Sequence, residues 1–340
     1  MKLLSFSLLA ATAGVASAFT VDIDPSSVTR IFDNFNDGVD TSTNHGNMAP
    51  AGEAGGFNSQ SMPPSAPDPQ FHYPTPGAAF NTSTYPYLRV RTRGTVGGPS
   101  QIFPRPPAGP TVLNYGTTTG FGEKQLTFVT PGPNGTGLRF DPLGGGTAVT
   151  EVFDFDYVML DRVRTIGLAE FDHDGALDGW TLSGNGHITG NSTSASSSTF
   201  IATTAGVDPI MQIGGLNIDT NIYNTIEVRA AFDPTSISRF EIFWGTNTFP
   251  GPAGGQSIAL VNELIRDGNL HTYRINMGDE ARWDGNLNIL RLDPLADADA
   301  AAGRSFEIDY VRLLDGAAIP EPSSALFALL GALLTLRRRR

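Results

Sequence analysis

Short runs of alternating apolar and polar residues recur along most of the chain. In the run 306–311, Phe-Glu-Ile-Asp-Tyr-Val, successive side chains would point to opposite faces of a β-strand, and the runs 226–230 and 240–244 follow the same period of two. Turn-forming pairs such as Asp267-Gly268 and Asp284-Gly285 separate the runs. Short strands joined by frequent turns predict an all-β fold made of antiparallel β-sandwiches, with few helices between the two ends of the chain.

The same strand pattern occurs twice, with a period of about 150 residues. The segment 138–143, Leu-Arg-Phe-Asp-Pro-Leu, returns at 290–295 as Leu-Arg-Leu-Asp-Pro-Leu, and 153–158, Phe-Asp-Phe-Asp-Tyr-Val, returns at 306–311. Weaker matches keep the same order: 101–103 with 241–243, 126–128 with 271–273, and 32–33 with 171–172. We therefore predict two tandem units of one fold, at 19–165 and 166–316. A proline- and glycine-rich insertion in the first unit, at 48–77, is expected to form a long exposed loop.

The first eighteen residues have the three parts of a secretory signal. Lys2 gives a positive start, an apolar stretch follows, and Ala16-Ser17-Ala18 supplies the small residues that signal peptidases require. We expect cleavage after Ala18, so that the exported chain begins at Phe19. The alternative is a short N-terminal helix that belongs to the fold.

The C-terminal segment 317–340 has its own ordered pattern. Pro320-Glu321-Pro322 interrupts regular structure, an uncharged apolar run covers 325–336, and four basic residues end the chain: Arg337, Arg338, Arg339 and Arg340. Because arginines cross hydrocarbon only at high cost, they would stay on the cytoplasmic side while the body lies outside. Twelve helical residues span about 18 Å, short of a hydrocarbon core of about 30 Å, which favours a transient membrane association. The alternative is an amphipathic tail that packs on the body.

This C-terminal arrangement resembles the PEP-CTERM domain that exosortase-type membrane enzymes recognise. The resemblance implies that the precursor is held in the inner membrane and that an exosortase-type enzyme then sorts the protein to the cell surface or the extracellular matrix. The fold expected as a whole is two tandem β-sandwich units, flanked by a signal peptide and a short C-terminal apolar helix.

Charge and composition narrow the partners. The chain has 34 acidic and 22 basic residues, a formal net charge of −12. Without Lys2 and the four terminal arginines, 17 basic residues remain against 34 acidic ones, so the body carries about −17. Such a surface repels nucleic acid, which is therefore not expected as a partner. The absence of cysteine excludes disulfide bonds and thiol chemistry.

An ordered series of motifs runs through the second unit: Phe171-Asp172, Gly179-Trp180, 240–244, 271–273, Trp283-Asp284-Gly285, 290–294 and 306–311. In this order they resemble jelly-roll domains of the carbohydrate-binding, galactose-binding-like type. The resemblance implies a structural calcium where an acidic residue of the last strand meets the start of the domain. On the matching residues this would join Asp309 with Asp172, and Asp156 with Asp33. The alternative is that these aspartates cap turns or pair with arginines such as Arg291.

Carbohydrate is the ligand class that the resemblance implies. Sugar rings stack on exposed aromatic faces, and the candidate platforms are Trp180, Trp244, Tyr273 and Trp283. A tryptophan inside a regular strand, as Trp244 would be, also fits a core position. The sequence contains no Gly-x-Ser-x-Gly, His-Glu-x-x-His or phosphate-binding glycine loop, so we expect no catalytic residues. The sequence favours a non-catalytic exported protein that binds extracellular polysaccharide. The alternatives are a structural envelope protein without a small ligand and a polysaccharide-active enzyme.

Overall fold

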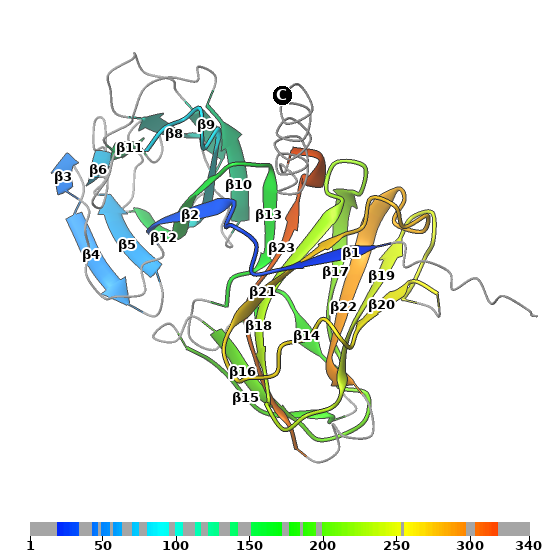
Figure 1. Cartoon of the computed structure of the whole chain (residues 1–340). Coiled ribbons are helices and arrows are strands. Elements are labelled where there is room, and N and C mark those ends of the chain that lie inside the picture. The colour runs from blue at the N-terminus through cyan, green and yellow to red at the C-terminus, as the bar shows by residue number, and fades with distance from the viewer. Residues whose placement is uncertain are drawn as a thin grey trace, which may run out of the picture.

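The computed structural model describes residues 19–33, 43–46, 49–54, 57–62, 70–74, 80–94, 99–104, 113–116, 122–128, 137–141, 151–171, 177–183, 186–194, 199–252, 255–296 and 303–318. Within these residues the secondary structure consists of strands β1 to β23 and one 3-10 turn, Gly316–Ala318. The predicted β-sandwich fold is confirmed: the described residues are all-β and form two antiparallel, jelly-roll-like sandwiches, whereas the expected signal peptide and C-terminal helix lie outside the described residues (Figure 1).

The first sandwich has two sheets that we name after their central strands. The β12 sheet has the order β10 (Gly122–Thr127), β7 (Tyr87–Gly94), β12 (Glu151–Asp161), β5 (Phe57–Met62), β4 (Ala49–Ala54), with β2 (Thr29–Asp33) also paired to β12. The β11 sheet has the order β3 (Thr43–Gly46), β6 (Gln70–Pro74), β11 (Gly137–Asp141), β8 (Pro99–Pro104), β9 (Leu113–Gly116). The core between the two sheets of the first sandwich includes Leu88, Val90, Phe140 and Phe155.

The second sandwich follows the same plan. The β23 sheet has the order β1 (Thr20–Ile23), β21 (His271–Asn276), β18 (Thr225–Phe232), β23 (Ser305–Leu314), β16 (Thr199–Thr204), β15 (Ile188–Ser194), with β13 (Thr165–Ala169) also paired to β23. The β22 sheet has the order β14 (Thr181–Leu182), β17 (Met211–Asp219), β22 (Asn286–Ala296), β19 (Arg239–Thr246), β20 (Ser257–Leu260). A large core that includes Phe200, Ile242 and Leu292 fills the space between these sheets.

Strand by strand, the two units have the same order, with β1 as the single addition among the described strands. The two strong sequence matches fall on equivalent strands and at equivalent positions: the first pairs β11 with β22, and the second pairs β12 with β23. One weak match falls on the correct strands but four residues out of register. Leu126 lies opposite Leu88 and Ile275 lies opposite Ile226, which makes Leu126 the counterpart of Ile275. The repeat therefore reflects a duplicated topology.

Two boundary predictions need correction. Strand β1 lies within 19–165 but pairs with β21 of the second unit, because β21 offers a free sheet edge and Phe19 and Val21 pack on the second core. The segment 48–77 contains strands β4, β5 and β6 where a long loop was expected. Proline is tolerated there because Pro50 lies on β4, the edge strand of its sheet.

A histidine between two carboxylates fastens the end of β1. The His271 Nδ1 atom lies 2.7 Å from Asp24 Oδ2, and His271 Nε2 lies 3.1 Å from Asp267 Oδ1. The backbone N–H of Thr272 donates to Asp24 Oδ1 at 2.9 Å. Hydrogen bonding to Asp24 raises the pKa of His271, so its charged form strengthens the attachment of β1.

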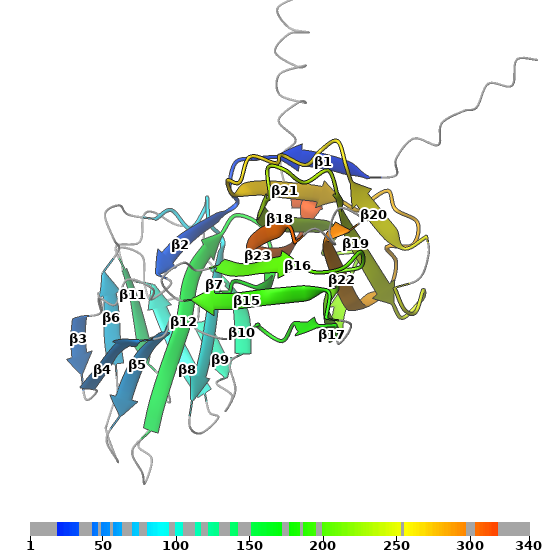
Figure 2. The ribbon, with the colours of Figure 1, turned by 90° about the horizontal axis from the view of Figure 1, so that it is seen from below.

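The first strand starts and the last strand ends at the same end of the β23 sheet. Thr20 lies opposite Asn276, Asn276 opposite Thr225, and Thr225 opposite Leu314. Both views show β1 and β23 in the second unit (Figures 1 and 2).

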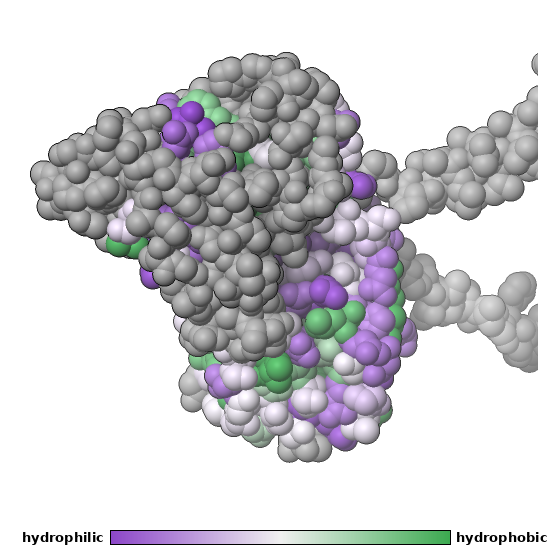
Figure 3. All heavy atoms as spheres, turned by 90° about the vertical axis from the view of Figure 1, so that its left-hand side faces the viewer, coloured by the Kyte–Doolittle hydropathy of each residue, from purple (hydrophilic) through white to green (hydrophobic). Residues whose placement is uncertain are grey.

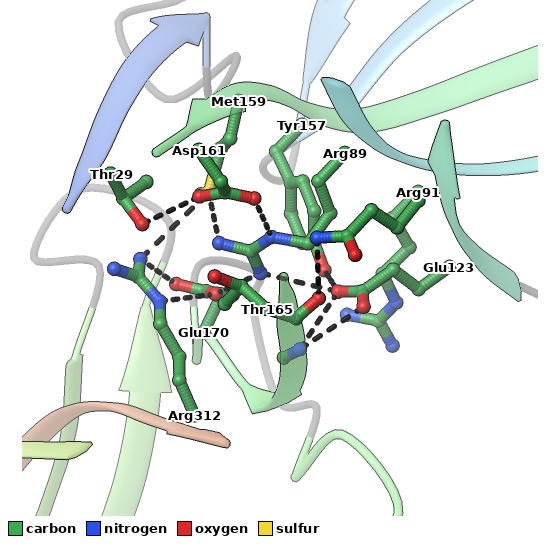
Figure 4. A network of polar contacts seen from close by, with 12 residues as sticks. Thr29, Arg89, Arg91, Glu123, Tyr157, Met159, Asp161, Thr165, Glu170 and Arg312 are labelled. Atoms are coloured by element: carbon green, nitrogen blue, oxygen red, sulfur yellow. Dashed lines mark hydrogen bonds and ion pairs between the residues drawn. The ribbon is translucent and has the colours of Figure 1, made fainter. Parts of the chain in front are cut away.

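A buried polar network joins the two units (Figure 4). Arg89 of β7 is fully buried; its Nε donates to Asp161 at 3.0 Å, and its Nη1 donates to Glu170 at 2.7 Å and to Glu123 at 3.2 Å. Arg312 of β23 donates from Nε to the same Glu170 at 2.8 Å. Glu170 is thus shared by an arginine from each unit. Burial would raise the pKa of Glu170, but the charges of Arg312 and Arg89 outweigh it and lower that pKa.

Close backbone contact completes this joint. The Gly167 N–H of β13 donates to Glu123 of β10 at 3.1 Å, and the Tyr157 hydroxyl donates to the same carboxylate. A Cβ atom on Gly167 would lie 2.6 Å from Glu123 Oε2 and 2.7 Å from Arg89 Nη1, so the glycine permits the approach of β13 to the first unit. Burial raises the pKa of Glu123 although Arg89 lowers it. The β12 and β23 sheets therefore supply the joint, and the β11 and β22 sheets lie on the far side of each unit.

Candidate functional site

The visible surface mixes polar and apolar residues. The large exposed apolar side chains among the described residues are scattered: Ile23, Ile201, Val207, Ile237 and Val261. Figure 3 shows the same interspersion on the lower part of the molecule, which the second unit forms. Polar side chains that the sheets hold in fixed positions are therefore the candidates for binding a ligand.

Such a group lies on the outer face of the β22 sheet. Leu290 and Leu292 point into the core, so the alternating residues Arg291 and Asp293 lie on the opposite face. Arg291 Nε donates to Asp293 Oδ1 at 2.6 Å, and the Arg291 guanidinium carbon lies 4.7 Å from the ring centre of Phe243 on the neighbouring strand β19. The strand register places Phe243 directly opposite Arg291.

The first unit has the same group at equivalent positions of the β11 sheet. Arg139 Nε donates to Asp141 Oδ1 at 2.6 Å, and its guanidinium carbon lies 5.0 Å from the ring centre of Phe103. Phe103 lies directly opposite Arg139 in the register of β8 and β11. We call these two groups the first triad (Phe103, Arg139, Asp141) and the second triad (Phe243, Arg291, Asp293).

The triads place charged donors beside charged acceptors. Arg291 Nη2 also donates to Asp208 at 2.6 Å, and Glu241 lies opposite Asp293 in the register. In the first unit, Gln101 lies opposite Asp141. Burial raises the pKa of Asp293 to about 6, although the hydrogen bonds from Arg291 lower it. Asp141 and Asp293 are buried, so each triad offers partly exposed N–H donors and part of an aromatic ring over a buried carboxylate, and the half-exposed Asp208 adds a carboxylate acceptor in the second unit.

The aromatic platforms expected from the sequence are not exposed. Trp180, Trp244, Tyr273 and Trp283 all lie in the second core and are at most 6% exposed. The indole N–H of Trp244 donates to the Arg282 carbonyl at 3.1 Å, and the rings of Trp244 and Trp283 meet edge to face. The prediction that these four rings form a sugar-stacking surface is wrong, because all four rings pack inside the second core and their polar atoms form hydrogen bonds within the fold.

Two of the predicted calcium ligands pair with arginines. Asp156 lies 2.7 Å from Arg91, and Asp309 pairs with Arg229. These pairs are equivalent, since the strand register shifts at both aspartates. Asp172 and the side chain of Asp33 lie outside the described residues, and the described ones contain no cluster of three or more His, Asp or Glu side chains suited to a metal ion. Calcium binding by Asp309 with Asp172, or by Asp156 with Asp33, stays a prediction.

The export and sorting signals also lie outside the described residues: Ala16, Ala18, Pro320, Glu321, Pro322, Arg337, Arg338, Arg339 and Arg340. In the part of the chain that the structure does describe, no helix combines the length and the apolar character that crossing a bilayer requires.

The sequence interpretation missed the triads, although a signal was available. Both Arg-x-Asp pairs lie in the strongest repeat match, and a spacing of two puts the arginine and the aspartate on the same strand face. The aromatic partner comes from the neighbouring strand, so only the strand register could identify it.

No protein-family model and no curated protein matches the sequence. Solved structures with similar architecture exist. The N-terminal CBM22-1-CBM22-2 tandem domain from Paenibacillus barcinonensis Xyn10C aligns over 86% of this chain and 99% of its own, with 9% identity and a TM-score of 0.29. A family 29 carbohydrate-binding module from Piromyces equi aligns over 42% of this chain and 89% of its own, with 7% identity and a TM-score of 0.28. A structure described as CBM4 aligns over 37% and 98%, with 19% identity and a TM-score of 0.30.

Proposed function

We propose that this chain is an exported, non-catalytic protein that binds uncharged polysaccharide through its two triads. The observation that carries the proposal is that one arrangement of arginine, aspartate and phenylalanine occurs in the same register on the outer sheet of both units. Hydrogen bonds to a buried carboxylate hold each guanidinium in place, so its outward N–H donors are already positioned for a ligand.

The chemistry of a triad fits a hydroxyl-rich ligand. The partly exposed guanidinium donates hydrogen bonds to sugar hydroxyls, and in the second unit the half-exposed Asp208 carboxylate beside Arg291 accepts them. The phenylalanine ring supplies an apolar surface for the C–H side of the sugar ring. The second triad has Asp293, Asp208 and Glu241 around Arg291, and the body carries about −17, which disfavours an anionic polysaccharide.

Export and sorting complete the proposal. The N-terminal signal and the C-terminal Pro-Glu-Pro tail would take the protein across the inner membrane, with transient membrane association of the tail and processing by an exosortase-type enzyme. The cell surface or the extracellular matrix would be its destination. Structural calcium remains a proposed cofactor. A structural envelope protein without a small ligand is the second candidate, favoured by the buried joint that holds the two units together. A polysaccharide-active enzyme is the third, for which no described group of residues argues.

Affinity electrophoresis of the mature protein against soluble neutral and anionic polysaccharides tests the proposal. We expect retardation by at least one neutral polysaccharide, and weakening by about tenfold or more when Phe103→Ala and Phe243→Ala are combined, equivalent to about 1.4 kcal/mol. Arg229→Ala is the control, because it removes a surface side chain from the β23 sheet and leaves both triads intact. Equal binding by the double variant and the control would remove the triads from the proposal. Release of reducing ends by the unaltered protein would favour the enzyme.

A further inference from the structure

We infer that the protein cross-bridges two separate polysaccharide strands, because its two triads lie on opposite sides of the molecule and a buried joint fixes them there. The inference rests on the proposed function of the triads. It adds a consequence that a single binding face would not have.

The positions of the sheets carry the argument. The first unit contributes Arg89, Glu123 and Asp161 to the joint, from strands β7, β10 and β12 of the β12 sheet. The second unit contributes Arg312 from β23 and Gly167 from β13, both in the β23 sheet. Each triad lies on the other sheet of its unit, on the face turned away from the core. Figure 1 shows the β11 sheet at the upper left of the molecule and the β22 sheet at its right.

The distance between the triads also favours two separate strands. Within each sandwich the sheet that carries the triad lies about 10 Å from the sheet that supplies the joint, so the thickness of both sandwiches separates the two triads. A polysaccharide strand bound at one triad would have to pass around both sandwiches to reach the other. Two strands, one on each side, require no such bend.

The joint prevents the units from turning both triads to one side. The chain crosses the joint twice, at 24–28 between β1 and β2 and at 162–164 between β12 and β13. On the first crossing, Arg274 of the second unit donates to the Ser26 carbonyl at 3.2 Å. The charges of Arg89, Glu170 and Arg312 are buried together, so rotation of one unit would leave charges without partners in a dry site.

Light scattering of the mature protein mixed with a neutral polysaccharide that it binds tests the inference. Two variants each remove one triad: Phe103→Ala with Arg139→Ala, and Phe243→Ala with Arg291→Ala. We expect the unaltered protein to increase scattering strongly, to lose the effect at large protein excess, and each variant to reduce it at least tenfold while its remaining triad binds within about twofold of normal. A mixture of the two variants should also fail to cross-link.

Each outcome has a separate meaning. Normal scattering by either single-triad variant would overturn the cross-bridge, as would binding at both triads without any increase in scattering by the unaltered protein. Loss of binding to every polysaccharide would instead overturn the proposed function, and the inference with it. Thermal unfolding of each variant checks its fold, and Arg291→Gln with Phe243→Leu serves as the milder second-triad variant if the alanine pair unfolds early.

Discussion

Arg89 offers the most direct test of the joint. Its guanidinium is fully buried and lies within 3.2 Å of three carboxylates: Asp161, Glu170 and Glu123. In Arg89→Met the side chain keeps much of its volume but loses its charge, which leaves the three carboxylates with a reduced counter-charge in a site shielded from water. Removing one partner of a buried ion pair costs about 3–5 kcal/mol of folding free energy.

The measurement is urea-induced unfolding at pH 7, followed by tryptophan fluorescence of the second core. At about 2–4 °C per kcal/mol for a unit of this size, the same loss lowers the melting temperature by about 6–20 °C. Arg93→Met is the matched control, since Arg93 lies on the same strand and pairs with Asp154 but is 40% exposed. Exposed pairs contribute about 0–1 kcal/mol, so this variant should unfold almost normally.

The pH dependence separates lost charge from lost packing. Without Arg89, the already raised pKa of Glu123 should rise further and the lowered pKa of Glu170 should rise as well, because both groups lose an opposite charge. A carboxylate whose pKa is raised in the folded state destabilises the fold while it is charged, and protonation removes that cost. The free energy of unfolding that Arg89→Met loses should therefore be smaller at pH 5 than at pH 7. A cost for Arg89→Met no larger than that for Arg93→Met would refute the buried joint. A deficit that is the same at both pH values would refute its electrostatic origin.

Two further predictions concern contacts at and near the joint. Gly167→Ala should destabilise the protein by about 1–3 kcal/mol in urea unfolding, because its Cβ would lie 2.6 Å from Glu123 Oε2; an unchanged midpoint would mean that β13 can move aside. Asp24→Asn should lower the pKa of His271 in an NMR titration, because Asp24 is the main cause of its raised value. Because the pKa of His271 is raised in the folded state, its contribution to stability is complete below the unfolded pKa near 6.5 and is lost as the pH rises through the folded pKa. Amide exchange in β1 should therefore accelerate in the variant chiefly at low pH. An unaltered His271 titration would contradict the contact.

The strands and their duplication could be predicted because both depend on local pattern. Alternation in 306–311 and the repeated Leu-Arg-x-Asp-Pro-Leu each report on neighbouring residues. The register between strands depends on residues far apart in the sequence. The sequence comparison therefore matched Leu126 to His271, although the structural counterpart of Leu126 is Ile275. The position of β1 depends on a sheet edge about 250 residues away, so no local signal could assign it to the second unit.

The side chains of the site were harder to predict than the fold. Tryptophan is suited both to sugar stacking and to a core, and the alternation that predicted strand β19 does not say which face is inside. Trp244 faces inward and its neighbour Phe243 faces outward, so the candidate face was missed by one residue. Arg89 and Glu170 are 81 residues apart, and their contact depends on how two units pack, which sequence patterns do not specify.

The shared end of β1 and β23 has a mechanical consequence. A pull on the chain beyond Leu314 acts along β23, whose neighbours are β18 on one side and β13 and β16 on the other. Ladder hydrogen bonds run across the strand direction, so such a force shears many of them together and cannot open them one at a time. Tension from a polysaccharide bound to the first unit would reach β23 partly through the chain crossing at 162–164 and partly through Glu170 and Arg312, which makes that charged contact one of the couplings that carry the load.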